Sequence, residues 1–465
     1  AGQIFNKLKE IYVKAQNAAN DINDPNARAA LQREINNLID AIQKIATDTE
    51  YNGIRLLNGT FTNKYIHYGP RSGQVVSVSI PNLQASALGA YTMQGSGQAN
   101  VQTAVGLSGW ANADYVVDAG DSLTISSGST SVTLTGADLG VTNPDFGGNR
   151  FVDAYTIAQA INGNSALQQA GISATASNDK VAAVAYGSGL AQLSGNGDIA
   201  DVSITLKIYV GDTKVFEKTY SQTGVLVNGS TVAVGPDLDS LIQDINNSVL
   251  NGGQLTASKD DTGTKLRLTT SNGQTVLVQV DVSLTASNND ATAGESINLG
   301  IDLGKIVPHS NNLTVTDTEG GASATGTASG VSVGDLVVAG VDNFTITQSG
   351  IASLGLNPVQ FENLYNIDVS TNSGAERALI ITQTAIRKVD TVRSQIGAIM
   401  NNLQSIYDAQ KVAMDNTNEA ENVIRNVDFA KEMATFTTMQ IRMQAGIAML
   451  AQANALPQLV LQLLR

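Results

Sequence analysis

The chain contains 465 residues, with 27 Lys and Arg, 41 Asp and Glu, 44 Gly and no Cys. The lack of Cys excludes disulfides, thiolate metal sites and cysteine nucleophiles, and the two histidines are too few for a three-histidine zinc site. A net charge of −14 disfavours binding to nucleic-acid phosphates, and no apolar run approaches the ~18 residues that a membrane span needs.

The charge is distributed unevenly along the chain. Residues 91–355 hold 9 basic and 24 acidic side chains, whereas the two flanks together hold 18 and 17. Alternating apolar and polar residues concentrate in the acidic middle, and helical periodicity concentrates in the flanks. The sequence therefore predicts an α+β multidomain protein, in which both chain ends form a long antiparallel helical bundle and β-rich domains are inserted between them.

Two helices are predicted at the amino end. Ile4, Leu8 and Ile11 form a short apolar stripe, and Asp24-Pro25-Asn26 is a helix start signal. The second helix carries apolar residues at alternating spacings of four and three, which is the heptad pattern of a coiled-coil seam. The residues of this seam are Leu31, Ile35, Leu38, Ile42 and Ile45.

A β-hairpin is predicted after these helices. Asn52-Gly53 and Asn58-Gly59 are turn signals, and Val76, Val78 and Ile80 then alternate with polar residues. We therefore expect residues 1–90 to form an amino-terminal helical arm with a β-hairpin.

The acidic middle contains an internal repeat with a period of about 84 residues. Residues 156–162 are followed by the segment 171–174, and residues 239–246 are followed by the similar segment 255–258. Each copy predicts a short helix and then a strand, with further strands around it.

We divide this middle into two β-rich outer modules, at 91–195 and 196–355. Residues 320–330 are almost entirely Gly, Ala, Ser and Thr, and we interpret them as a linker or loop. A last β segment is expected at 336–347.

A long helix is predicted at the carboxyl end, because no proline lies between Pro358 and Pro457 and residues 373–376 are a helix start signal. Its apolar residues keep the 4-3 spacing, and Gln410 and Thr417 weaken the seam, so we expect a bend or break near them. Such a helix is too long to stand without packing against others. The seam includes Val389, Val392, Ile396, Ile399, Leu403, Ile406, Ile424 and Val427.

The last segment, residues 429–464, is apolar on nearly every face, so it must be buried. Two interpretations remain: it is a core helix of the monomer, or it is buried in a multi-subunit assembly. Its main apolar residues are Phe429, Met433, Phe436, Met443, Leu450 and Leu464. We assign 356–420 to the long helix and 421–465 to this second helical part.

The sequence shows no motif of an enzyme. It has no P-loop, no G-x-S-x-G and no H-E-x-x-H, and His67 and His309 lie in no known catalytic arrangement. Residues 259–263 and 198–201 could supply calcium oxygens but are better explained as turns. Trp110 is either part of a sugar-stacking platform or a core residue. We expect no catalytic residue, no bound metal and no cofactor.

Both ends of the chain resemble bacterial flagellin, over about 200 residues and in the right order. At the amino end the similarity is carried by residues 31–35, 45–53 and 56–59. At the carboxyl end it is carried by Gly374, Ala375 and Ala378 and by residues 393–398, 427–433, 450–454 and 463–465. The middle resembles the variable outer domains of that family.

The resemblance implies a structural subunit of the bacterial flagellar filament that assembles with other flagellin subunits. It also implies an extracellular location, export through the flagellar type III apparatus without a cleaved signal peptide, and contacts with an export chaperone and with cap or hook-junction proteins. The helical ends, with 421–465 as the filament-core helix, would line the filament core, and the acidic modules would face outward.

Two departures from the family pattern are visible. The family has further amino-terminal helices before the part that residues 1–19 resemble, so we expect a truncated chain that polymerises poorly. The family's contact with an innate-immune receptor uses an Arg, a Leu and a Glu. The matching positions are Lys7, Ile11 and Glu34, of which the first two differ.

An alternative function is a flagellin-like surface protein whose outer domains bind a polysaccharide or host ligand, as an adhesin does. The net charge of the middle opposes a polyanionic glycan, although a local cluster of Lys207, Lys214 and Lys218 could bind one.

Overall fold

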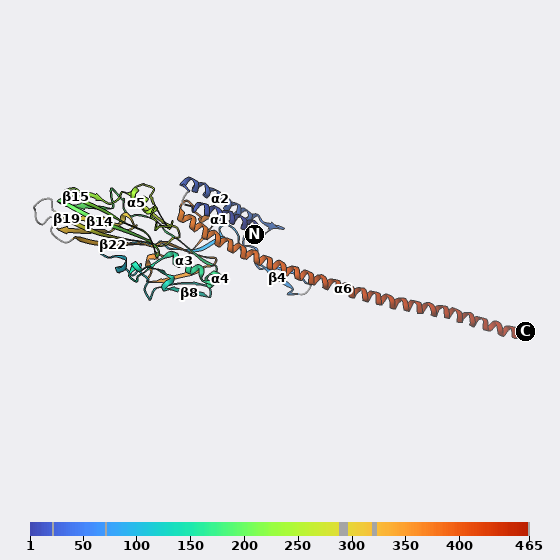
Figure 1. Ribbon diagram of the computed structural model, residues 1–465. Helices are drawn as coiled ribbons and strands as arrows, with labels where there is room; N and C mark the ends of the chain where they lie inside the picture. The colour runs from blue at the N-terminus through green and yellow to red at the C-terminus, as the bar shows by residue number, and fades with distance from the viewer. Residues whose placement is uncertain (21–22, 70–71, 288–295, 319–322, 464–465) are drawn as a thin grey trace. The chain divides into compact units, whose positions relative to one another are not determined.

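The computed structural model describes residues 1–20, 23–69, 72–287, 296–318 and 323–463 (Figure 1). The chain divides into two units. Unit 1 contains Ala1–Thr60 and Pro81–Arg393, and unit 2 contains Phe61–Ile80 and Ser394–Arg465. Each unit is described by itself below.

Unit 1 begins with two helices, α1 (Gly2–Ala18) and α2 (Pro25–Asp48), as predicted. Asp24 caps α2 by accepting a hydrogen bond from the Ala27 N–H at 2.7 Å, and Pro25 occupies the first turn, where no N–H is needed. The buried faces of the two helices consist of Ile4, Leu8, Ile11, Ala15 and Ala18, and of Ile35, Ile39, Ile42 and Ala46.

The predicted seam of α2 is buried only in part. Ile35 and Ile42 are buried, whereas Leu31, Leu38 and Ile45 are half-buried. A straight helix has 3.6 residues per turn, so a strict seven-residue pattern drifts around it. Ile39 and Ala46 therefore occupy the inner positions in place of their neighbours.

The carboxyl end forms one helix, α6 (Asn372–Leu463), of 92 residues. The predicted break near Gln410 and Thr417 is wrong, because α6 is continuous through both, and a bend there stays a prediction. A weak apolar seam reduces the packing of a helix against its neighbours, but the helix itself is held by hydrogen bonds between its own backbone groups. The Thr417 hydroxyl itself donates to the Ala413 carbonyl at 2.8 Å and so fits inside the helix.

The first part of α6 packs antiparallel to α1 within unit 1 (Figure 1). The Arg393 guanidinium lies 4.6 Å from the centre of the Phe5 ring, near the amino end of α1. Ala19, at the other end of α1, lines a pocket together with Asn372 and Ser373 at the start of α6. The predicted fold class, a bundle of both chain ends with a β-rich insert, is confirmed.

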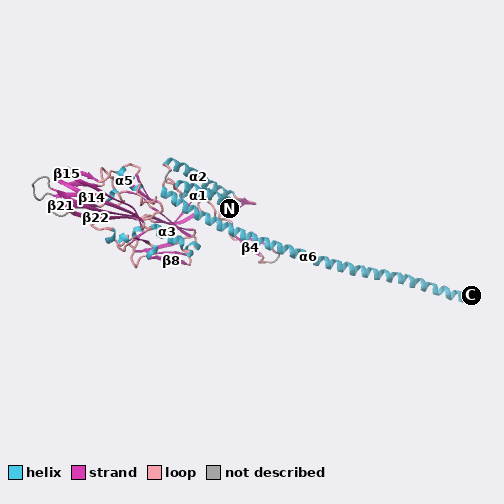
Figure 2. Ribbon diagram, in the orientation of Figure 1, coloured by secondary structure: helices cyan, strands magenta, loops and turns pink. Residues whose placement is uncertain are grey.

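Antiparallel sheets make up the middle of the chain (Figure 2). The five-stranded sheet has the order β15 (Thr213–Asn228), β14 (Asn196–Val210), β19 (Val276–Ser287), β22 (Ala324–Ser332), β6 (Ala99–Thr103). One four-stranded sheet has the order β11 (Ile172–Ser177), β23 (Asp335–Gly340), β5 (Gly89–Gln94), β25 (Gln360–Asn363). Another has the order β16 (Val232–Val234), β13 (Ala191–Ser194), β20 (Ser296–Asp302), β21 (Asn312–Thr318).

Smaller sheets complete unit 1. One three-stranded sheet has the order β12 (Asp179–Val181), β18 (Leu266–Thr270), β17 (Leu255–Lys259). The other has the order β24 (Thr345–Ser349), β7 (Ser122–Ser127), β8 (Thr130–Thr135). The two-stranded sheets are β1 (Glu50–Tyr51) with β2 (Ile54–Arg55), and β9 (Gly140–Thr142) with β10 (Arg150–Val152). The short helices are α3 (Ala154–Gly163), α4 (Ser165–Gln169) and α5 (Leu238–Asn246). Between β1 and β2, Asn52 and Gly53 both have positive φ, as the predicted Asn-Gly turn requires.

The sheets and short helices enclose two hydrophobic cores. Core A joins the buried side chains of α5 to those of β14 and β19 in the five-stranded sheet. Leu241 and Ile245 of α5 are 0% and 1% exposed. Core B packs α3 and α4 against β11 and β23 and contains Trp110 and Phe151. The boundary that the sequence suggests between modules, at 195/196, stays a prediction.

The predicted linker at 320–330 is wrong for the part that the structure describes, because residues 324–330 belong to β22; residues 320–322 lie outside the described residues. β22 pairs with β19 and β6, so it is an inner strand. Its small residues are required by close packing. A Cβ on Gly326 would lie 2.4 Å from Val315 Cγ2, and one on Gly330 would lie 3.2 Å from Val307 Cγ2.

The two copies of the repeat share a short helix capped by an Asp, Asp153 for α3 and Asp237 for α5, and a later strand, β11 or β17. In the first copy the additional helix α4 lies between α3 and β11, so the expectation of one short helix in each copy holds only for the second. Near the end of each helix an Asn side chain bonds to the backbone of that strand.

Unit 2 contains a β-hairpin and the remainder of α6. The hairpin consists of β3 (Lys64–His67) and β4 (Val75–Val78), with Tyr65 opposite Ser77. The Asn63 N–H donates to Ser79 Oγ at 2.8 Å beyond the strand ends. The predicted hairpin is therefore confirmed; residues 70 and 71 lie outside the described residues.

Candidate assembly site

The helical bundle of unit 1 is fixed to the β-rich part by side chains of α2 and α6. The Gln32 side chain donates to the Ile367 carbonyl at 3.0 Å and accepts from the Val369 N–H at 2.7 Å. Lys388 Nζ donates to the Ala87 carbonyl at 2.9 Å, and burial lowers the pKa of this lysine. These polar contacts hold the start of α6 in place between α2 and the sheets.

The predicted seam of α6 is buried at its beginning and exposed towards its end. Val389 and Val392 are buried, and Ile396, Ile399, Leu403 and Ile406 are half-buried. Ile424 is 63% exposed. The side chain of Val427 lies outside what the structure describes.

The predicted filament-core residues are exposed within unit 2. The exposed fraction is 66% for Phe429, 48% for Met433, 60% for Phe436, 61% for Met443 and 65% for Leu450. Leu464 lies outside the described residues. With Ile447, which is 62% exposed, these residues recur at spacings of four and three, with the polar Gln440 at one position. We call Phe429, Met433, Phe436, Met443, Ile447 and Leu450 the distal stripe.

Exposed apolar surface of this extent marks an interaction site rather than a solvated surface. No helix in the described part of the chain is long and apolar enough to cross a membrane. Within unit 2 no other element covers the stripe, so the described residues of this unit give no support to a monomer core helix, and burial in an assembly stays a prediction. The distal stripe is therefore the candidate site for contacts with other protein chains.

The candidate immune-receptor positions lie on α1 and α2. Lys7 pairs with Glu10 at 3.1 Å, and Glu34 pairs with Lys14 across the two helices. Ile11 is fully buried between helices. A receptor could reach the two charged side chains directly, and contact through these positions stays a prediction.

The lysine cluster proposed for glycan binding is occupied by acidic partners. Lys207 pairs with Asp281 at 3.0 Å, Lys214 with Glu217 at 2.7 Å, and Lys218 with Asp244 at 2.7 Å. These ion pairs leave little positive potential for a polyanion.

Trp110 is a core residue. It is 5% exposed and meets Tyr115 and Phe151 edge to face, at centroid distances of 6.1 and 5.9 Å. A buried indole offers no platform for stacking a sugar.

The candidate calcium turns use their carboxylates internally. Asp260 accepts hydrogen bonds from the Thr262 hydroxyl and from the Thr264 and Lys265 N–H groups. Asp201 accepts from the Gly224 N–H at 2.8 Å, whereas the Asp198 side chain lies outside what the structure describes. Within the described ranges, no group of three or more His, Cys, Asp or Glu side chains could hold a metal ion.

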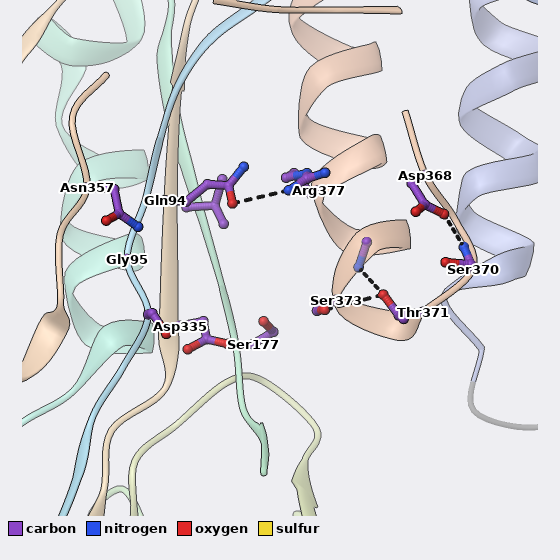
Figure 3. A pocket seen from close by; sticks show the side chains of 13 residues that line it. Gln94, Gly95, Ser177, Asp335, Asn357, Asp368, Ser370, Thr371, Ser373 and Arg377 are labelled. Atoms are coloured by element: carbon purple, nitrogen blue, oxygen red, sulfur yellow. Dashed lines mark hydrogen bonds between the residues drawn. The ribbon is translucent and has the colours of Figure 1, made fainter. Parts of the chain in front are cut away.

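A polar pocket of about 260 Å³ lies at the start of α6 (Figure 3). Arg377 extends from α6 and donates to Gln94 Oε1 at 3.1 Å, with Glu362 at 3.7 Å. Asp368 accepts from the Ser370 N–H at 2.9 Å, and the bonds from Ser370 lower the pKa of Asp368. Because Arg377 contacts both Gln94 and Glu362, the pocket acts as a structural joint between α6 and the strands β5 and β25.

Comparison with known proteins agrees with these features at both chain ends. Residues 1–62 match the model of the bacterial flagellin N-terminal helical region, and residues 379–464 match that of the bacterial flagellin C-terminal helical region. A flagellin of Aquifex aeolicus (strain VF5) is 49% identical over 100% of this chain and 84% of that protein. A flagellin of Aquifex pyrophilus is 47% identical over 100% of this chain and 83% of that protein.

Among solved structures, FliC from Burkholderia pseudomallei is 14% identical, with a TM-score of 0.29, over 86% of this chain and 94% of that one.

Proposed function

The chain belongs to the bacterial flagellin family, and on that premise we propose that the distal stripe of α6 is its principal contact with other flagellin subunits. The protein is a structural subunit of the bacterial flagellar filament, which lies outside the cell, and it is not an enzyme. The exposure of the distal stripe is the single observation that carries the proposal.

The size of the stripe supports a strong contact. Full burial of a large apolar side chain contributes on the order of 1.5–3 kcal/mol. Six such side chains, arranged with the heptad spacing of a coiled coil, could together contribute about 10 kcal/mol before the cost of association is subtracted. A neighbouring helix of another subunit is the surface that fits such a stripe.

The division of charge supports an orientation in the filament. The flanks are nearly neutral, whereas residues 91–355 carry 24 acidic and 9 basic side chains. We therefore assign 1–90, 356–420 and 421–465 to the packed interior, and the modules at 91–195 and 196–355 to the outer surface, where like charges keep filaments apart.

Family membership supports a proposal of further partners. We propose export through the flagellar type III apparatus without a cleaved signal peptide, transient binding of an export chaperone, and contacts with cap and hook-junction proteins at the filament ends. Each of these partners needs an accessible helical surface, and α6 offers one.

Substitution of Phe436 by Asp tests the role of the stripe. A carboxylate at this position would have to be desolvated in the subunit contact, so we expect at least a tenfold loss of assembled filament. The measurement is electron microscopy of filaments, together with the amounts of secreted and assembled protein, in a flagellated bacterium whose complete flagellin carries the substitution.

The matched control is Asn418→Asp, which adds the same charge at an exposed position of the same helix, outside the seam and outside the segment 429–464. We expect this variant to assemble nearly as well as the unmodified protein. Equal assembly of the two variants, both at the unmodified level, would rule out the stripe as a principal contact.

A further inference from the structure

A second pocket of unit 1 lies between the β-rich part and α6. It has a volume of about 530 Å³, which is within the usual range for small-molecule sites. Its lining comes from the end of α3, from α4, from β11 and from α6. The lining residues are Asn162, Gln168, Ile172, Ser173, Ala174, Thr175, Ile380, Gln383 and Arg387. We call this cavity the Arg387 pocket.

Strand β11 presents polar groups towards the pocket. Ile172 and Ala174 belong to core B, and side chains alternate along a strand, so Ser173 and Thr175 point to the opposite face. Ser173 is only 7% exposed, and its buried hydroxyl has no hydrogen-bond partner among the described residues. Buried polar groups are normally satisfied, so this hydroxyl indicates a missing partner.

Arg387 is the only charged residue in the lining. It is half-buried, and within the described residues its guanidinium takes part in no hydrogen bond, ion pair or ring contact. On the same helix, by contrast, Arg377 pairs with Glu362 and Arg393 with Asp390. An unpaired guanidinium in an acid-free pocket of an acidic chain indicates an anionic ligand.

The neutral groups narrow the class of anion. The hydroxyls of Ser173 and Thr175 and the amide of Gln383 suit a ligand with hydroxyl groups, whereas the Gln168 amide already donates to the Asn162 carbonyl. A single guanidinium matches one planar carboxylate. A phosphate would need more positive charge or free backbone N–H groups, and the N–H of Ala174 already donates to Asn162 Oδ1 at 2.9 Å.

We propose that the Arg387 pocket binds a small monocarboxylate that also carries hydroxyl groups, namely a sugar acid. Arg387 pairs with the carboxylate, and Ser173 and Gln383 bind hydroxyls. The pocket contains no residue of the distal stripe, so the proposal is independent of the assembly contact.

The test is calorimetric titration of the full chain with glucuronate, glucose, inorganic phosphate and N-acetylglutamate. We expect saturable binding of glucuronate at one site, with glucose and N-acetylglutamate at least tenfold weaker and phosphate unable to compete. Arg387→Gln should weaken glucuronate binding at least tenfold. Ser173→Ala should weaken it roughly threefold to tenfold, as the loss of one hydrogen bond does.

The matched control is Arg425→Gln, the same change on the same helix outside the pocket, which should leave binding unchanged. Thermal unfolding checks that each variant is folded, and Arg387→Lys replaces Arg387→Gln if the latter is unstable, since it keeps the charge but loses the planar fork. The proposal is overturned by absent glucuronate binding, by equal affinity for glucose, by preference for phosphate or N-acetylglutamate, or by unchanged binding in both pocket variants.

Discussion

At the scale of single residues, two asparagines show how the repeated modules protect their sheets. Asn162 Nδ2 donates to the Ala174 carbonyl at 2.7 Å, and its Oδ1 accepts from the Ala174 N–H at 2.9 Å. Asn246 makes the same pair of bonds with Ala257, both at 2.8 Å. Ala174 lies on β11 and Ala257 on β17, which are edge strands of their sheets. Each asparagine thus occupies backbone groups that an exposed edge offers to other chains.

Replacement of Asn246 by Ala should lower the free energy of unfolding by about 1–2 kcal/mol, because two hydrogen bonds to the backbone of β17 are lost. Urea denaturation followed by circular dichroism measures the change. Asn247→Ala is the matched control, because this adjacent side chain is exposed and forms no hydrogen bond among the described residues, and it should change stability by less than about 0.5 kcal/mol.

The equivalent change in the first module, Asn162→Ala, can be followed by the fluorescence of Trp110, the only tryptophan of the chain, which lies in core B. We call the paired hydrogen bonds of Asn162 and of Asn246 the asparagine clamps. Equal stability of the two asparagine variants and the unmodified protein would show that water replaces both clamps at no cost.

Asp260 gives the stability of its turn a dependence on pH. Bonds from the Thr262 hydroxyl and from the Lys265 and Thr264 N–H groups lower the pKa of Asp260 to about 2, from an ordinary value of 3.8. A carboxyl group with a lowered pKa in the folded state stabilises that state above its ordinary pKa, and the effect is lost as the pH falls through the lower value. Asp260 therefore contributes fully above about pH 4 and not below about pH 2.

Asp260→Asn should remove this contribution, so its unfolding free energy should vary less between pH 4 and pH 2 than that of the unmodified protein. Urea denaturation at a series of pH values measures the difference. Asp261→Asn removes the same charge from the neighbouring position, which is 93% exposed, and should preserve the unmodified pH dependence. An identical pH profile for both variants would contradict the role of Asp260.

At the scale of elements, β22 shows how composition can mislead. Its run of Gly, Ala, Ser and Thr is typical of a linker, yet it forms an inner strand. The small residues are there because β21 and the segment around Val307 pack directly on this strand. Composition reports only the absence of large side chains, and it does not tell whether solvent or another element fills the space.

Gly326→Val tests this explanation. The added side chain would meet Val315, so we expect the variant to be destabilised by about 1–3 kcal/mol, as overpacked cores are. Gly300→Val is the matched control on β20, an inner strand of a four-stranded sheet, where the nearest atom to an added Cβ is 4.0 Å away. It should be neutral or stabilising, because valine favours strands. Comparable loss of stability in both variants would indicate a general intolerance of valine instead.

At the scale of the whole molecule, the sequence predicted what depends on local periodicity. The spacing of Ile4, Leu8 and Ile11 and the capping segment at Asp24 were sufficient for α1 and α2, and alternation was sufficient for β4. The break near Gln410 was predicted wrongly because an apolar seam reflects packing against other helices, whereas the continuity of a helix depends on its backbone hydrogen bonds.

The features that the sequence did not predict depend on topology. The asparagine clamps require knowledge of which strands lie at the edges, and the Arg387 pocket joins β11 to a helix more than 200 residues later in the chain. The repeat aligned Asn162 with Asn246, which was the one local signal of the clamps. No sequence signal marked Arg387 as unpaired, because from the sequence alone any other arginine of α6 is equally plausible as the unpaired one.

The separation of charge along the chain predicts how the protein associates in solution. Its net charge at pH 7 is −14, and its isoelectric point is about 4.6. Since the excess acid is concentrated in residues 91–355, repulsion between these regions should oppose sideways association at pH 7.

The repulsion disappears as the pH approaches 4.6, and about 1 M salt shortens its range at pH 7 to about 3 Å. Light scattering should therefore rise towards pH 4.6, and rise less strongly on addition of salt at pH 7. Scattering that is greatest at pH 7 and low salt would mean instead that the exposed apolar stripe of α6, and not the acidic middle, governs association.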